Sequence, residues 1–235
     1  MRRLKMRLDK FLSNAKVGSR KEVKRLIKFG IVKINGEIIT NVDFKVKEND
    51  IVTVNNTPIT PYHNVYIIFN KPTGYTSSKS EFERNIFEFI DHPYVENLHI
   101  AGRLDKDVEG LLLITNDGIF THKITSPKSK IEKEYIVKVD KEISDEMIQK
   151  AKDGIVLKNG TRFKPAIIKR LKDNFISITI TEGKYHEIKL IVKFLGLSYK
   201  KIERIRIGKL KLEDFNLKRG EWSEIDYKTA LKALE

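Results

Sequence analysis

The sequence predicts an α+β protein. A small module of helices and short strands, residues 1–56, precedes a larger domain, residues 65–235, with a mainly antiparallel central sheet and flanking helices. Helical patterns come first, and from residue 66 onward short β-branched runs between turn residues dominate. Helices interrupt these runs irregularly, whereas a parallel α/β fold would place one after every strand. Pro58 and Pro61, in a short polar stretch, predict a linker over residues 57–64.

The first module is expected to contain two helices and three short strands. Ser19 and Glu22 have the spacing of a capping box, so the second helix should begin there and stop at Gly30. Asn35-Gly36 is a two-residue hairpin signal between two apolar runs. The expected helices cover residues 7–15 and 20–29, and the expected strands cover residues 31–34, 38–39 and 51–54.

The larger domain is expected to be rich in strands. Four consecutive apolar residues, Leu111–Ile114, indicate a buried strand. The expected strands cover residues 66–69, 98–100, 111–115, 134–139, 166–171, 175–181 and 199–207. The expected helices cover residues 119–125, 144–151, 185–195 and 227–234.

Positive charge is concentrated at one end of the chain. The formal net charge is +14 over 235 residues. Residues 1–33 contain twelve Lys and Arg residues against two acidic ones, Asp9 and Glu22, so this segment alone carries +10. Such an asymmetry indicates a polyanionic partner.

Residue types and motifs that the sequence lacks exclude several classes of site and cofactor. The chain has no cysteine, which excludes disulfides, zinc ribbons and thiol nucleophiles, and its five histidines lack metal-ligand spacing. Gly-rich nucleotide-binding motifs are absent as well. We therefore expect neither a metal nor a cofactor. With no apolar run near the length of about 18 residues that spans a membrane, and no signal-peptide pattern, we expect a cytoplasmic protein without a membrane partner.

A charged turn lies directly against the buried strand at Leu111–Ile114. Asp105 is at its centre, two residues after Arg103, where a neighbouring cation could keep the carboxylate ionised. From the residues alone, a solvated turn before a core strand is the commoner explanation of such a pattern. The turn is therefore a candidate carboxylate site and no more.

Two segments of this region, Gly102–Asp105 and Gly110–Gly118, together resemble the signature of the ribosomal RNA pseudouridine synthases. Further segments follow the order of that family's motifs: residues 70–75, 122–127, 132–135 and 182–189. The segments at 122–127 and 183–186 look most like the branch that modifies one uridine of 16S ribosomal RNA. The resemblance implies uridine 516 as the target.

The resemblance also implies an active-site cleft across a central antiparallel sheet, working without a cofactor. Asp105 matches the catalytic carboxylate of the family, and Lys189 matches the cation that keeps it charged. Tyr135 matches the active-site tyrosine, whose ring could stack on the target uracil. An ordinary half-buried strand tyrosine is the alternative for Tyr135.

RNA-binding residues are expected in both parts of the chain. The first module resembles the RNA-binding domain named after ribosomal protein S4, which implies a basic face, although a merely solvated face is the alternative. The expected contacts there are Arg7, Lys10, Arg20, Lys21, Lys24, Arg25 and Lys28. Around the cleft, the residues expected to contact RNA are Lys71, Tyr75, Arg103, His122, Lys184, Tyr185 and His186. A local role at a helix start is equally compatible with His186.

Three positions depart from the family pattern. Val108 stands where Thr or Ser is usual, and Glu187 and Leu190 stand where a Gln and a second basic residue are usual. The leading interpretation is an active monomeric synthase acting on 16S ribosomal RNA within a small-subunit assembly particle. The alternatives are a synthase for large-subunit ribosomal RNA and a catalytically silent RNA-binding factor. A glycoside hydrolase fits poorly because it needs two opposed carboxyls.

Overall fold

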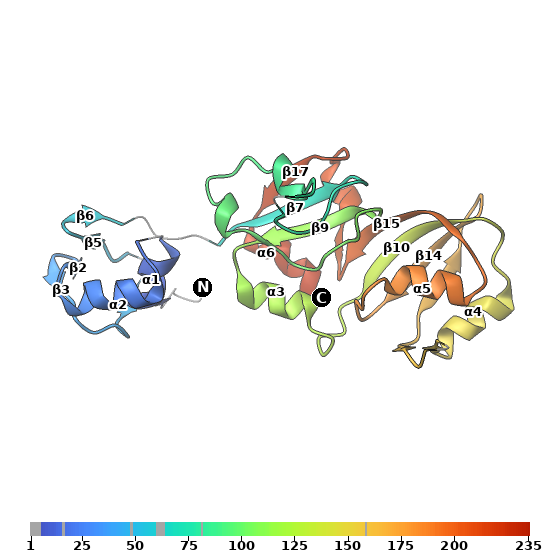
Figure 1. Ribbon diagram of the computed structural model, residues 1–235, viewed down its shortest axis with the longest axis horizontal. Helices are drawn as coiled ribbons and strands as arrows, with labels where there is room; N and C mark the ends of the chain where they lie inside the picture. Colours follow the sequence, from blue (N-terminus) through green and yellow to red (C-terminus); the bar gives the residue numbers. More distant parts are fainter. Residues whose placement is uncertain (1–5, 16, 48, 60–63, 81, 158) are drawn as a thin grey trace. The chain divides into compact units, whose positions relative to one another are not determined.

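A computed structural model describes residues 6–15, 17–47, 49–59, 64–80, 82–157 and 159–235 (Figure 1). The chain divides into two compact units, residues 1–63 and 64–235. Residues 60–63 of the predicted linker, and Lys16 with the first five residues of the basic segment, lie outside the described residues. The α+β class is confirmed, with most helices and strands close to their predicted positions.

In the first unit, two helices pack against short strands. α1 spans Leu8–Asn14, and α2 spans Arg20–Lys28. The predicted capping box is present, with Ser19 and Glu22 each bonding the other's backbone N–H. The predicted hairpin joins β2 and β3 through Asn35 and Gly36, both at positive φ. The strands are β1 (Met6–Arg7), β2 (Val32–Ile34), β3 (Glu37–Ile38), β4 (Lys45–Val46), β5 (Val52–Val54) and β6 (Thr57–Pro58).

A nine-stranded sheet forms the centre of the second unit. Its main path runs β13-β14-β10-β15-β9-β7-β17, with β16 added to β15 and β8 to β9. All pairs are antiparallel except β15 with β9. The strands are β7 (Tyr66–Lys71), β8 (His99–Ile100), β9 (Glu109–Thr115), β10 (Lys133–Val139), β13 (Ile167–Arg170), β14 (Phe175–Ile180), β15 (Tyr199–Ile207), β16 (Leu210–Lys211) and β17 (Trp222–Ile225). A separate hairpin pairs β11 (Ile155–Val156) with β12 (Arg162–Phe163).

Two apolar cores lie on opposite faces of β7 and β9. Ile67 and Leu112 belong to one core, and Ile68 and Leu113 belong to the other. Burial on both faces explains why these strands are apolar throughout instead of alternating. Figure 1 shows α4 and α5 beside the β10–β14 end of the sheet, and α3 and α6 beside β7 and β9. The helices are α3 (Gly118–Thr125), α4 (Asp145–Lys152), α5 (Glu187–Phe194) and α6 (Tyr227–Leu231). Within the described ranges, no helix has the length and apolar character needed to span a membrane.

The parallel contact between β9 and β15 requires a glycine. Gly110 pairs with Arg204 and has a φ of +102°. A Cβ atom at Gly110 would lie 2.3 Å from the Arg204 carbonyl oxygen, which is closer than real Cβ contacts occur. This close approach joins the two halves of the sheet directly beside the turn that contains Asp105.

Replacing Gly110 with Ala should therefore strongly destabilise the protein. Backbone strain at a positive φ and overpacking at the strand contact together predict a loss of about 2–6 kcal/mol in the free energy of unfolding. Urea unfolding measures this loss. Gly118→Ala is the matched control, because Gly118 starts α3 with nothing within 4 Å of its would-be Cβ. A loss at Gly110 no larger than at Gly118 would contradict the close approach.

Candidate active site

A cleft of about 480 Å³ lies in the second unit. The turn between β8 and β9, strand β10, and helix α5 with the residues just before it all contribute to its lining. Asp105, Tyr135 and Lys189, predicted as a set from separate motifs, all line this cleft. The topology thus brings together three residues that are up to 84 positions apart in the chain, from 105 to 189.

Asp105 is held between two basic side chains from one segment. The Lys189 ammonium lies 3.0 Å from Asp105 Oδ2, and His186 Nε2 lies 3.5 Å from the same oxygen. The Asp105 side chain retains 30% of its exposure, so it can be reached from the cleft, whereas Lys189 retains 15%. A half-buried ammonium at this distance stabilises a negative charge on the carboxylate.

Lys189 is shared with a second carboxylate that the sequence did not predict as its partner. Its ammonium lies 2.5 Å from Asp107 Oδ1, and the Tyr199 hydroxyl donates to Asp107 Oδ2 at 3.1 Å. Burial alone would lower the pKa of Lys189, but its hydrogen bonds to Asp107 and Asp105 outweigh burial and raise that pKa above its ordinary value. For Asp107, burial acts to raise the pKa, and the bond from Lys189 leads the contributions that bring it below its usual range.

The prediction that Lys71 lies at the cleft rim is wrong. Its side chain is fully buried at the end of β7. The ammonium donates to the carbonyl oxygens of Pro72 at 3.0 Å, Lys106 at 3.2 Å and Val108 at 2.7 Å. Burial lowers the pKa of Lys71 to about 8. Lys71 therefore fixes the backbone on the far side of Asp105 instead of facing RNA.

Two further residues hold the same turn, and sequence analysis missed both. Ser77 Oγ donates to the Leu104 carbonyl at 2.7 Å and accepts from the Leu104 N–H at 3.2 Å. The Arg204 guanidinium, 1% exposed, donates to the carbonyls of Leu111 at 2.8 Å and Gly102 at 2.9 Å. The glycines at 102 and 110 were a signal of close backbone packing, but nothing in the sequence identified Arg204 as the packing partner.

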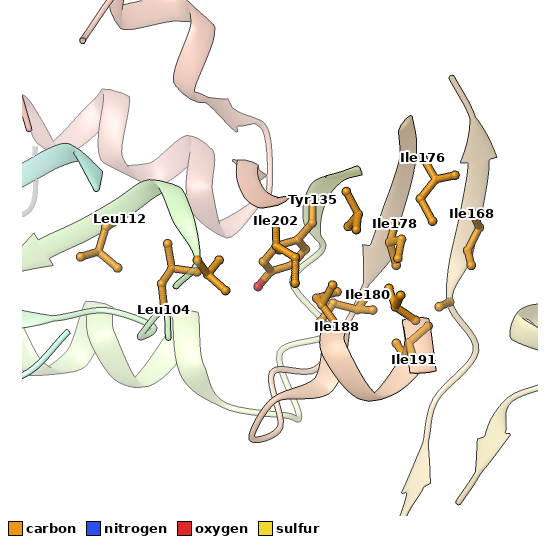
Figure 2. Close-up of a cluster of buried hydrophobic side chains, with 14 of the residues drawn as sticks. Leu104, Leu112, Tyr135, Ile168, Ile176, Ile178, Ile180, Ile188, Ile191 and Ile202 are labelled. Carbon is orange, nitrogen blue, oxygen red and sulfur yellow. The ribbon is translucent and has the colours of Figure 1, made fainter. Parts of the chain in front are cut away.

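Apolar side chains form the inner wall of the cleft. Figure 2 shows Tyr135 in the middle of a buried cluster, between Leu104 on one side and Ile188 with Ile180 on the other. Tyr135 is 7% exposed and lies on β10, two residues after Lys133. Lys133 also lines the cleft, and burial lowers its pKa to about 8.

The other residues predicted at the rim divide into two groups. Arg103, Lys184, Tyr185 and His186 line the cleft, with the Tyr185 ring stacked 3.7 Å from the His186 ring. Tyr75 and His122 do not belong to the cleft lining as described. Tyr75 is half-buried under the guanidinium of Arg84, and His122 is exposed on α3, whose last residue, Thr125, does line the cleft.

In the first unit, one of the seven basic residues predicted to contact RNA is ion-paired within the protein, and the other six are exposed on helices. Arg7 forms ion pairs with Asp9, at 2.9 Å, and with Asp43, so its charge is already balanced within the protein. The remaining six are exposed on α1 and α2: Lys10, Arg20, Lys21, Lys24, Arg25 and Lys28.

No group of three or more His, Asp or Glu side chains that could hold a metal ion occurs among the residues the structure describes. The chemistry available in the cleft is that of a carboxylate paired with an ammonium, beside an apolar wall and the buried lysine Lys133. Such a site can bind a planar polar ligand and present it to Asp105.

Two family models match the chain. The model described as RNA pseudouridylate synthase matches residues 65–193, which include every residue lining the cleft except Ile202 and Arg204. The S4 domain model matches residues 6–52 in the first unit.

Curated relatives match along nearly the whole chain. A protein from Aquifex aeolicus (strain VF5), named an uncharacterized RNA pseudouridine synthase, is 39% identical over 94% of this chain and 92% of its own. A ribosomal small subunit pseudouridine synthase A from Vibrio parahaemolyticus is 38% identical, covering 89% and 91%. Its namesake from Escherichia coli (strain K12) is 35% identical, covering 92% and 95%. A crystal structure of a pseudouridylate synthase superposes with a TM-score of 0.69 at 33% identity, covering 97% and 99%.

Replacing Lys189 with Met tests the ion-pair network. The change leaves Asp105 and Asp107 without their shared cation, so we expect a loss of about 1–2 kcal/mol of stability at pH 7. The lowered pKa of Asp107 contributes stability that is present above the ordinary carboxyl range and is lost as the pH falls through the folded-state value. The difference in stability between wild type and variant should therefore shrink as the pH falls below the ordinary carboxyl range.

Urea unfolding at several pH values measures this difference. Lys193→Met, an exposed lysine on the same helix, is the matched control and should change stability by less than about 0.5 kcal/mol. A Lys189→Met loss that is independent of pH would show that the ammonium does not balance these carboxylates.

Proposed function

We propose that this chain, which belongs to the RNA pseudouridylate synthase family, converts one uridine of 16S ribosomal RNA to pseudouridine with Asp105 as the essential carboxylate. The observation that carries the proposal is the 3.0 Å pairing of Asp105 with Lys189 inside a cleft of the family-matched region. The small-subunit target is supported by the names of the relatives from Vibrio parahaemolyticus and Escherichia coli. The motif resemblance points to uridine 516.

The proposed reaction is an isomerisation. The bond between the ribose and uracil N1 breaks, the base turns over, and C5 joins the ribose carbon. The C5 proton leaves to solvent, and N1 takes up a proton in exchange. The product has the composition of the substrate, so no other molecule needs to supply atoms or electrons. The demands on the protein are a charged carboxylate at the ribose, a wall that retains the detached base, and a group near the C5 proton.

Asp105 meets the first demand. Its carboxylate is reachable from the cleft, and Lys189 on α5 stabilises its charge. Asp107 anchors the same ammonium from the other side at 2.5 Å, so Lys189 cannot move far from Asp105. The sequence and the geometry fit both attack by Asp105 on the nucleotide and proton abstraction from the ribose, and either step needs the ionised form.

Tyr135 and its apolar neighbours meet the second demand. The ring lies in the cleft wall, where it can contact the face of a detached uracil, and its hydroxyl is the group we assign to the C5 proton. A uridine reaches this depth only after leaving its stack. Arg103 and Tyr185 at the cleft mouth are suited to phosphate contact and base stacking while the nucleotide is held outside the helix.

The first unit supplies sequence-independent affinity in this proposal. Its exposed lysines and arginines on α2 match the requirement of a surface that binds RNA phosphates. We place the protein in the cytoplasm with its ribosomal RNA substrate, and an assembly particle is the preferred form of that substrate.

Replacing Asp105 with Asn separates an enzyme from a silent binding factor. The amide keeps the size of the side chain and removes the charge, so folding and RNA affinity should persist. The rate should fall at least about a thousandfold. Tritium release from C5-labelled uridine in 16S ribosomal RNA, naked or in the particle, measures the rate. Asp107→Asn on the same turn is the comparison: it keeps the Asp105 carboxylate and only loosens the anchoring of Lys189, so it should remain active with a far smaller loss of rate.

Wild-type release of tritium by Asp105→Asn would remove this residue from the reaction. Mapping pseudouridine in 16S and 23S ribosomal RNA of cells with and without the gene tests the target. A missing pseudouridine in 23S ribosomal RNA alone would favour the large-subunit alternative.

Neutralising three lysines of α2 tests the first unit. Every lysine–phosphate pairing that is removed should reduce the slope of log affinity against log salt by about 0.7–0.9. The triple change of Lys21, Lys24 and Lys28 to Gln should therefore lower the slope for binding to 16S ribosomal RNA by about two. The same change at Lys141, Lys152 and Lys172, exposed lysines of the second unit, is the matched control. If both triple variants had the same slope of log affinity against log salt, the lysines of α2 would be solvent-exposed residues that do not contact RNA phosphates.

A further inference from the structure

Two buried glutamates lie beside the cleft, and the reaction proposed above uses neither. Glu182 is 4% exposed and Glu187 is 3% exposed. A buried carboxylate needs donors or a cation to offset its desolvation. Glu182 has them, because the Lys164 backbone N–H donates to Oε1 at 2.7 Å and the Lys184 ammonium lies 3.2 Å from Oε2.

Glu187 is only half satisfied as a carboxylate. Its Oε2 accepts from the Lys184 backbone N–H at 2.8 Å. Its Oε1 is buried and has no donor among the residues the structure describes. The nearby Lys133 on β10 does not supply one, since its ammonium is directed to the carbonyls of Ile131 and Glu182 at 3.3 and 3.4 Å.

A proton on Glu187 would remove the cost of a buried carboxylate oxygen without a donor, because the protonated carboxyl is neutral. Glu182 acts on the Glu187 side chain, and two carboxyls can share a hydrogen bond only if one of them holds a proton. Burial raises the pKa of Glu187 to about 7; the bond from Lys184 opposes this rise and the charge of Glu182 adds to it. At neutral pH the group is therefore divided between its acid and carboxylate forms.

The Glu187 side chain holds the turn that presents the basic residues of the site. Its carboxyl accepts from the Lys184 N–H, while its own N–H donates to the Lys184 carbonyl at 3.2 Å, so residues 184–187 form a closed turn. His186 within this turn is in a left-handed conformation, with φ of 54°. Glu187 also begins α5, which carries Lys189. Both contacts to Asp105 thus depend on this turn.

We propose that Glu187 is a positioning residue that acts as the neutral acid, sharing a proton with Glu182 so that His186 and Lys189 stay in place against Asp105. Ionisation of Glu187 puts two buried carboxylates next to each other, with Lys184 and Lys133 as the cations facing them. Their repulsion opens the turn and withdraws the basic residues. The inference rests on the proposed function, since its effect is exerted on Asp105.

The test is the pH dependence of kcat for tritium release from 16S ribosomal RNA. With a pKa of about 7, the neutral fraction falls from about nine-tenths at pH 6 to about one-tenth at pH 8, so kcat should fall about tenfold. Glu187→Gln retains the size, can donate to Glu182 and does not titrate. Whatever its absolute rate, its ratio of kcat between the two pH values should be close to one, apart from changes due to other groups.

Those other groups include Lys71 and Lys133, each with a pKa of about 8. Lys71 affects wild type and variant alike, whereas the charge of Glu187 raises the pKa of Lys133, so the substitution moves the titration of Lys133 to a lower pH. Glu146→Gln, an exposed glutamate on α4, is the matched control and should keep the wild-type ratio. An equal fall of kcat in wild type and in Glu187→Gln would overturn the proposal.

A direct titration keeps the proposal testable if the variant is inactive. In protein with ¹³C-labelled glutamate carboxyls, the signal that disappears in Glu187→Gln should titrate near pH 7, and a midpoint below about 5.5 would overturn the proposal. Wild-type protein that released no tritium at any pH would contradict the proposed function. The carboxyl titration would still decide how Glu187 ionises.

Discussion

The buried guanidinium of Arg204 is the interaction on which the site geometry depends. It bonds one carbonyl on each side of the Asp105 turn, at Gly102 and at Leu111. A charged group taken out of water is tolerated only when its donors are satisfied, so both ends of the turn are held to β15. Gly110 permits this because a side chain there would collide with the Arg204 backbone. The position of Asp105 is therefore set by the sheet.

Cations on two sides of the turn balance its acidic residues. Asp105, Asp107 and Glu109 all act on the buried ammonium of Lys71, and each raises its pKa against the larger lowering caused by burial. Lys189 contacts the first two carboxylates through the cleft. A turn with three carboxylates in five residues is thus stabilised from inside by Lys71 and from the cleft by Lys189, while the Asp105 side chain stays accessible to a ligand.

Structural features that a few neighbouring residues determine could be predicted from the sequence. The capping box of α2 and the Asn35-Gly36 hairpin were found because a few adjacent residues specify each of them. β16 and β17 were not predicted, because their positions are set by β15 and β7, the strands they pair with, and not by a signal in their own residues. Lys71 was misplaced because lysines are normally exposed. Its burial depends on carbonyls some 35 residues farther along the chain, which only the folded sheet brings near.

Two of the three departures from the family pattern, Val108 and Glu187, have a physical basis in this fold. Val108 is 5% exposed in the apolar core, and its backbone carbonyl, not its side chain, is what Lys71 holds. A methyl group can replace a hydroxyl there without loosening the turn. Glu187, where Gln is usual, is nearly buried, and a protonated carboxyl has one donor and one acceptor, like an amide. The acid can therefore fulfil the role of Gln, but only while it is protonated, and this makes its contribution to the site depend on pH.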